Sequence, residues 1–199
     1  MTGQDKDKHQ RISQKLKENV DASIAKAQIE RGILLVITGN GKGKSTAGFG
    51  TVARAVGHGQ KAAVAQFIKG TWACGERNLL ESHGVPFAVM NTGFTWDTQD
   101  RESDIAAAKL VWQEVKKFLS DPQYDVVLLD ELTYMLSFDY LDKTEVLDAI
   151  RNSPEHQTVI VTGRGAIKEL RDMADTVSVI KDEKHAYTAG IKARQGVDW

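Results

Sequence analysis

The sequence predicts an α/β fold, in which a mostly parallel β-sheet has helices on both faces. A helical arm is expected before this fold, at the N-terminus. From residue 32 onward, short apolar segments rich in Val, Ile and Leu alternate with longer segments of helical periodicity. Residues 124–130 are almost wholly apolar, as is typical of a central parallel strand. We therefore expect an arm over residues 1–31 and an α/β domain over residues 32–199.

The arm is predicted from one apolar stripe on a strongly charged background. Residues 1–10 are almost all polar, and a helix is expected over residues 11–31. Its apolar positions are Ile12, Leu16, Val20, Ile24 and Ala27. A helix this polar needs a surface to lie against. The pattern leaves open whether that surface is its own domain, or a site or second subunit that the arm covers.

The α/β domain is predicted to contain strands and helices in alternation. Strands are expected at 33–37, 61–68, 86–91, 124–130, 158–162 and 176–180. Helices are expected at 45–56, 77–82, 99–119, 143–151 and 167–174, and the tail at 181–199 shows no clear period. In the first helix we expect Phe49, Val52, Ala53 and Val56 to point inward. The strand order does not follow from the sequence.

Composition excludes several functional classes. The net charge of −1 over 199 residues gives no electrostatic basis for binding nucleic acid or an anionic membrane. A single cysteine, Cys74, excludes an internal disulfide framework and a cysteine zinc cluster. The polar N-terminus shows no signal sequence, and no segment approaches transmembrane length. We expect a cytoplasmic protein that binds neither membrane nor nucleic acid.

A glycine-rich turn follows the first strand of the α/β domain and leads into Lys-Ser-Thr and a helix. Strand, glycine turn, Gly-Lys-Ser and helix together constitute a P-loop, so the fold class is P-loop NTPase-like. Gly39, Gly41 and Gly43 allow backbone conformations that direct N–H groups toward a phosphate. Lys44 adds a positive charge, and the hydroxyl of Ser45 can bind Mg²⁺.

The loop departs from the usual P-loop pattern at one position. Thr38 stands where the pattern has its first glycine, so Gly39 and Gly41 must build the first turn. A dinucleotide-binding fingerprint fits less well, because Lys44 occupies its third glycine position. We therefore predict a variant phosphate-binding loop.

Ligands of parallel α/β sheets bind outside the carboxyl ends of the strands, so the residues after each strand are the next candidates. Asp130 and Glu131 end the fourth strand and resemble a Walker B element that holds Mg²⁺. Arg164, between two glycines after the fifth strand, is suited to bind phosphate. Arg54 is either a surface charge or a phosphate contact. Lys69 and the loop at 72–76 are weaker candidates.

Two aromatic residues, Phe94 and Trp96, follow the third strand in a glycine-flanked loop. In an extended segment both side chains point to the same side. They form either a hydrophobic plug for the core or a flat wall for a planar ligand, and the physical argument leaves both open. No nucleophile elbow, zinc-protease motif or positioned histidine pair is present, so the nucleophile of an enzyme reaction would belong to a substrate.

A further set of motifs occurs in order along the chain. They are TGNGKGKSTA at 38–47, ARAVGHG at 53–59, QFIKGTW at 66–72, GERN at 75–78, TGFTW at 92–96, VLLDELTY at 127–134 and TGRG at 162–165, followed by KHA at 184–186 and AGIKA at 189–193. In this combination the chain resembles the P-loop family of ATP:cob(I)alamin adenosyltransferases, or corrinoid adenosyltransferases. The resemblance runs from about residue 28 to the C-terminus and extends to the arm.

The resemblance implies that Co(I) of a reduced cobalamin attacks the 5′ carbon of ATP and that the whole triphosphate leaves. The catalytic residues would be Lys44, Phe94 and Trp96, with the two aromatic residues under the corrin ring, where they displace the lower axial base. A metal ion, Mg²⁺ or Mn²⁺, would be held by Ser45 with Glu131 or Asp130. The residues that would bind ATP are Gly39, Asn40, Gly41, Lys42, Gly43, Lys44, Ser45, Thr46, Arg54 and Arg164.

The resemblance also implies partners. The corrinoid would be cob(I)alamin, cobinamide or a cobyric-acid-type precursor, and a flavodoxin-like protein would supply the electron. The chain would form a homodimer in which the arm covers the corrinoid site of the other subunit. Two other functions remain open: a P-loop ATPase or nucleotide-dependent switch in which Glu131 activates water, and a binding module that delivers finished cofactor to another protein.

Overall fold

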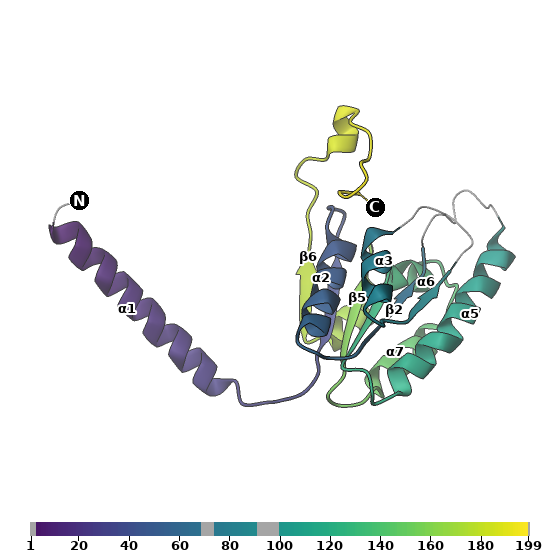
Figure 1. Ribbon diagram of the computed structural model, residues 1–199, viewed down its shortest axis with the longest axis horizontal. Coiled ribbons are helices and arrows are strands. Elements are labelled where there is room, and N and C mark those ends of the chain that lie inside the picture. Colours follow the sequence, from purple (N-terminus) through teal and green to yellow (C-terminus); the bar gives the residue numbers. More distant parts are fainter. Residues whose placement is uncertain (1–2, 69–73, 91–99, 199) are drawn as a thin grey trace. The chain divides into compact units, whose positions relative to one another are not determined.

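The computed structural model describes residues 3–68, 74–90 and 100–198, and the side chains from residue 9 onward within the first of these ranges (Figure 1). The chain divides into two compact units, Met1–Glu30 and Arg31–Trp199.

The first unit contains one helix, α1 (Gly3–Lys26). It begins earlier and ends earlier than the helix expected over residues 11–31. The early start is explained by residues 4–10, which include no proline, glycine or β-branched residue to oppose a helix. The four isoleucine, leucine and valine side chains of the predicted stripe are exposed on this helix.

The second unit is built on a six-stranded parallel sheet. Its strands are β1 (Leu34–Thr38), β2 (Ala62–Gln66), β3 (Phe87–Val89), β4 (Val126–Asp130), β5 (Thr158–Thr162) and β6 (Thr176–Val179). Their order is β3-β2-β4-β5-β1-β6, and every pair of neighbours is parallel. The predicted α/β fold class is confirmed. The order places β4, β5 and β1 side by side, so their carboxyl ends form one edge.

Helices connect the strands. They are α2 (Lys44–Gly57), α3 (Gly75–Ser82), α5 (Arg101–Ser120), α6 (Leu132–Ser137), α7 (Lys143–Arg151) and α8 (Lys168–Met173), with a 3₁₀ turn η1 (Ala186–Ala189) in the tail. The sequence reasoning missed α6. This helix is short and largely apolar, and without an alternation of polar and apolar faces it leaves no helical period to detect.

A hydrophobic core lies on each face of the sheet. One contains Phe49 and Val52 of α2 with Leu80 of α3. The other contains Trp112 of α5 with side chains of α6, α7 and α8. Figure 1 accordingly shows α2 and α5 on opposite sides of the sheet. Within α2, Ala55 is buried and Ala53 is exposed, so the expectation that Ala53 points inward was wrong.

β6 is the edge strand beside β1, and its four residues are all exposed. The chain that follows it forms the C-terminal tail, drawn in yellow in Figure 1. In the described part of the chain, no helix is both long enough and apolar enough to cross a membrane.

Candidate functional site

The predicted strand, glycine turn and helix are present as β1, residues 39–43 and α2. We call residues 39–43 the glycine loop. Gly39 and Gly43 have positive φ angles of 104° and 114°, which favour glycine. Gly43 is the N-cap of α2, and no side chain caps this helix, so its first N–H groups have no capping side chain. The N-terminus of α2 is therefore suited to bind an anion.

A cavity of about 190 Å³ lies at this helix terminus. It is lined by Lys42, Gly43, Lys44, Ser45, Thr46, Phe49, Glu76, Glu131, Val197 and Asp198. We call it the loop cavity. Its walls come from the glycine loop, α2, α3, the end of β4 and the C-terminal tail.

Two glycines of the loop also allow a close approach of the chain that follows β6. A Cβ atom at Gly39 would lie 2.3 Å from the carbonyl oxygen of Ile180, and one at Gly41 would lie 2.3 Å from that of Lys181. The Gly41 N–H donates to the carbonyl oxygen of Ile180 at 2.9 Å. The glycine loop and the start of the tail are thus packed backbone against backbone, which no larger residue at Gly39 or Gly41 permits.

Lys44 is the buried cation of this site, with 6% of its surface exposed. Its Nζ donates to the carbonyl oxygen of Gly41 at 2.7 Å. Burial lowers the pKa of Lys44, and the nearby charge of Glu131 acts in the opposite direction. A polyphosphate in the loop cavity would give this ammonium group a stronger acceptor than a carbonyl.

Asp130 and Glu131 have different environments. Asp130 is 2% exposed, and its Oδ1 accepts a hydrogen bond from the Thr162 hydroxyl at 2.7 Å, while its Oδ2 lies 3.4 Å from Nε2 of Gln66. Glu131 has a left-handed backbone (φ 60°), and its N–H donates to the same Thr162 hydroxyl at 3.0 Å. Thr162 therefore connects both acids, but of the two only Glu131 lines the loop cavity.

The turn after β5 packs against the turn after β4. Gly163 has φ 133°, and a Cβ atom there would lie 2.1 Å from the Thr133 hydroxyl and 2.9 Å from Oε2 of Glu131. The Thr133 hydroxyl donates to the carbonyl oxygen of Arg164 at 2.7 Å. The charge of Arg164 acts on Lys44, where it contributes to the lowered pKa. These contacts hold Glu131 and Arg164 at the same end of the sheet.

The family described as ATP:corrinoid adenosyltransferase BtuR/CobO/CobP matches residues 30–199. The corrinoid adenosyltransferase CobA of Salmonella typhimurium is 59% identical over 193 residues, which cover 97% of this chain and 98% of that protein. The corrinoid adenosyltransferase of Pseudomonas aeruginosa is 47% identical over 194 residues, 96% of each chain.

This chain belongs to the corrinoid adenosyltransferase family.

The expected family and the expected enzyme class, a transferase, are thereby confirmed. The rival interpretation as a P-loop ATPase or switch is not favoured.

The structure brings together only part of the predicted site. Lys42, Gly43, Lys44, Ser45, Thr46 and Glu131 line the loop cavity. Gly39, Asn40 and Gly41 belong to the same loop outside that lining, and Arg54 is an exposed residue in the last turn of α2. Phe94 and Trp96 lie outside the described residues.

Sequence reasoning missed Phe49, Val197 and Asp198 as cavity residues and considered Glu76 only within a weak candidate segment. Oε2 of Glu76 lies 3.3 Å from Sγ of the buried Cys74. Glu76 could have been predicted from the sequence, because it belongs to the motif GERN at 75–78. No sequence feature predicts Val197 and Asp198 as cavity residues, since only the tertiary structure brings the tail back to the glycine loop.

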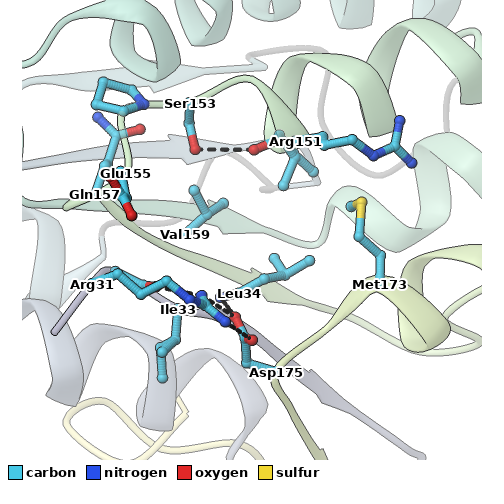
Figure 2. A pocket seen from close by; sticks show the side chains of 13 residues that line it. Arg31, Ile33, Leu34, Arg151, Ser153, Glu155, Gln157, Val159, Met173 and Asp175 are labelled. Carbon is cyan, nitrogen blue, oxygen red and sulfur yellow. Dashed lines mark hydrogen bonds and ion pairs between the residues drawn. The ribbon is translucent and has the colours of Figure 1, made fainter. Parts of the chain in front are cut away.

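A second cavity, of about 360 Å³, lies at the amino ends of the strands, where Leu34 begins β1 and Asp175 precedes β6 (Figure 2). Its polar residues are largely paired within the protein. Arg31 binds Asp175, and Nε2 of Gln157 donates to the carbonyl oxygens of Phe118, Asp121 and Tyr124 at 3.2, 3.3 and 3.1 Å. This arrangement is structural, so the loop cavity remains the candidate site.

Proposed function

We propose that this protein transfers the 5′-deoxyadenosyl group of ATP to the Co(I) centre of a reduced corrinoid and releases triphosphate. One observation carries the proposal. In a chain of the corrinoid adenosyltransferase family, a single cavity is lined by Lys42 and Gly43 of the glycine loop together with Lys44, Ser45 and Glu131. A cavity of this composition suits a polyphosphate.

The reaction forms a cobalt–carbon bond and breaks the bond between C5′ and its phosphate oxygen. The cobalt supplies the electron pair, and the electrons of the broken bond leave with the triphosphate. No proton is transferred, so no general base is required. The protein must bind the triphosphate and stabilise the negative charge that develops on it, a role that we assign to Lys44, the glycine loop and the N-terminus of α2.

For the metal ion we propose Ser45 and Glu131 as ligands, with Mg²⁺ preferred and Mn²⁺ as a substitute. Both residues line the loop cavity and offer the hard oxygen atoms that Mg²⁺ prefers. Asp130 does not line this cavity and is hydrogen-bonded by Thr162, so we assign it a supporting role. Among the described residues, no group of three or more His, Cys, Asp or Glu side chains is arranged to hold a metal. When bound, the ion neutralises leaving-group charge.

For the corrinoid we propose that Phe94 and Trp96 lie under the lower face of the ring. Four-coordinate Co(I) forms more readily once the lower axial base has been displaced. Asn40, Arg54 and Arg164 are proposed as further ATP contacts. We also propose a homodimer whose arm covers the corrinoid site of the other subunit, a flavodoxin-like reductant and a cytoplasmic location.

The deciding experiment mixes the purified protein anaerobically with cob(I)alamin, Mg²⁺ and ATP. We expect the visible spectrum to change to that of a light-sensitive cobalt–carbon product and the phosphate product to be intact triphosphate. The Lys44→Ala variant should lose about a hundredfold to a thousandfold in rate. ADP and phosphate without a corrinoid product would refute the proposal.

A further inference from the structure

The C-terminal tail forms one wall of the loop cavity, and it brings a negative charge there. Val197 and Asp198 line the cavity together with Lys42 to Thr46. Oδ1 of Asp198 lies 2.6 Å from Nζ of Lys42, a residue of the glycine loop itself. In Figure 1 the tail leaves β6 and turns back toward the ends of α2 and α3. A carboxylate thus occupies a position where the site should attract phosphate.

The tail contacts the glycine loop at both of its ends. At its start, the Gly41 N–H donates to the carbonyl oxygen of Ile180, at 2.9 Å. At its end, a turn holds Asp198, because the Arg194 N–H donates to Oδ2 of Asp198 at 2.8 Å and the Asp198 N–H donates to the Arg194 carbonyl oxygen at 2.8 Å. The hydrogen bond from Lys42, followed by that from Arg194, lowers the pKa of Asp198. Asp198 therefore carries its charge at neutral pH.

A triphosphate in the loop cavity conflicts with this arrangement. Its oxygens would be attracted to the ammonium group of Lys42, which Asp198 occupies, and would be repelled by the Asp198 carboxylate. Because Asp198 belongs to the same chain, it competes at a high effective concentration. The ion pair is also partly exposed, with 44% of the Lys42 side chain and 26% of the Asp198 side chain accessible, so it is weak enough to exchange.

We propose that Asp198 is a residue of the nucleotide site that binds Lys42 in competition with triphosphate and so limits how tightly the triphosphate product is held. The inference rests on the proposed role of the glycine loop as the triphosphate site. A site built to stabilise a leaving polyanion also tends to retain it, and product release limits many enzymes. A tethered carboxylate that returns to Lys42 opposes this retention.

The test measures binding of tripolyphosphate with Mg²⁺ by titration calorimetry at fixed ionic strength, without corrinoid. We expect Asp198→Asn to bind tripolyphosphate about fivefold more tightly than the wild type, as the loss of one partly exposed ion pair allows. Asp182→Asn makes the same change of charge in the same tail, outside the cavity lining, and should leave the affinity unchanged. In steady-state assays, added triphosphate should inhibit Asp198→Asn at lower concentrations than the wild type.

A double-mutant cycle with Lys42→Ala identifies the route of the effect. In the Lys42→Ala background, Asp198→Asn should raise the affinity for tripolyphosphate by clearly less than about fivefold, because only the direct repulsion by the carboxylate remains to be removed. Equal or weaker binding by Asp198→Asn in the wild-type background overturns the inference, because Asp198 would then be neutral or would position Lys42 for phosphate. If the wild type does not bind tripolyphosphate at all, both the role of Asp198 and the proposed triphosphate site are refuted. Corrinoid turnover by the wild type tests the proposed function separately.

Discussion

At the scale of single residues, Thr162 connects Asp130, the last residue of β4, with Glu131, which follows it. Its hydroxyl donates to Asp130 and accepts from the N–H of Glu131, and Thr162 is fully buried. Glu131 has a left-handed backbone conformation that a residue with a side chain adopts only when its surroundings support it. We infer that Thr162 is a positioning residue that holds the Glu131 carboxylate toward the loop cavity.

Thr162→Val should remove both hydrogen bonds while preserving the side-chain shape. The Asp130 carboxylate and the Glu131 N–H would both lose their hydrogen bond to the Thr162 hydroxyl. We therefore expect a loss of about 1–3 kcal/mol in the free energy of unfolding. The concentration of Mg²⁺ needed for half-maximal turnover should rise as well. Thr162→Ser keeps the hydroxyl and should restore the Mg²⁺ requirement, as measured by metal titration of the rate. Equal Mg²⁺ requirements in the two variants would exclude the positioning role.

Phe94 and Trp96 allow a second prediction at the residue scale. If they displace the axial base, Phe94→Ala and Trp96→Ala should impair the reaction mainly when it starts from Co(II) and a reductant. The loss should be smaller when Co(I) is supplied directly. The measurement is the ratio of the two rates in each variant. The same loss in both assays would instead favour the interpretation as a hydrophobic plug.

At the scale of elements, the glycine loop depends on its packing against the end of β6. φ of Gly41 lies outside the positive range, so alanine is conformationally allowed there, but its Cβ would lie 2.3 Å from the Lys181 carbonyl oxygen. The two nearest atoms belong to the backbone of Lys181, which cannot move as a flexible side chain does. The loop therefore requires glycine at this position for a steric reason.

We expect Gly41→Ala to lower the free energy of unfolding by about 1–3 kcal/mol and to weaken ATP binding. Gly50→Ala is the matched control. It lies on the exposed face of α2, where an added Cβ meets no atom within 4 Å. In this helix interior alanine should stabilise by about 0.5–1 kcal/mol. Urea unfolding of both variants measures the change in the free energy of unfolding, which should have opposite signs in the two. An unchanged free energy of unfolding in Gly41→Ala would contradict the packing argument.

At the scale of the whole molecule, an ion pair connects the start of the α/β domain to its edge strand. Arg31 binds both carboxylate oxygens of Asp175, and the Leu34 N–H donates to Asp175 at 2.9 Å. The hydrogen bond from Arg31, followed by that from Leu34, lowers the pKa of Asp175 to about 2. The residues before β1 are thereby joined to the residue before β6.

This pair predicts how stability depends on pH. The folded-state pKa of Asp175 lies below the unfolded value, so its contribution is present above about pH 4 and is lost as the pH falls toward about 2. Asp175→Asn should therefore be less stable than the wild type at neutral pH, and the difference should shrink across that window. The midpoints of urea unfolding at several pH values measure this difference in stability between the variant and the wild type. A difference that stays constant down to about pH 2 would show that the charge of Asp175 contributes nothing.

The arm gives the second prediction at this scale. Its apolar stripe is exposed, and residues 1–30 form a compact unit of their own. Deleting residues 1–26 should leave the α/β domain folded with its tripolyphosphate affinity unchanged. If the arm covers a corrinoid site, the deletion should raise KM for the corrinoid and not for ATP. Unchanged corrinoid kinetics would leave the arm without the proposed role.

Local patterns in the sequence were enough to predict the fold class, the family and most of the elements. The helix Lys143–Arg151 and the strand Thr158–Thr162 have the predicted bounds, since each has an apolar period of its own and clear flanking signals. The glycine loop, Lys44, Ser45 and Glu131 could be predicted as site residues because their spacing in the chain is typical of the chemistry.

Three features became visible only in the folded chain: the strand order, the different environments of Asp130 and Glu131, and the position of the tail. Asp130 and Glu131 are adjacent in sequence, yet their side chains have different environments. Asp130 is hydrogen-bonded by the Thr162 hydroxyl on the neighbouring strand, and the left-handed backbone of Glu131 places its side chain in the loop cavity. Asp198 meets Lys42 across an interval of 156 residues. No local pattern encodes such contacts, because they arise from how distant segments pack together.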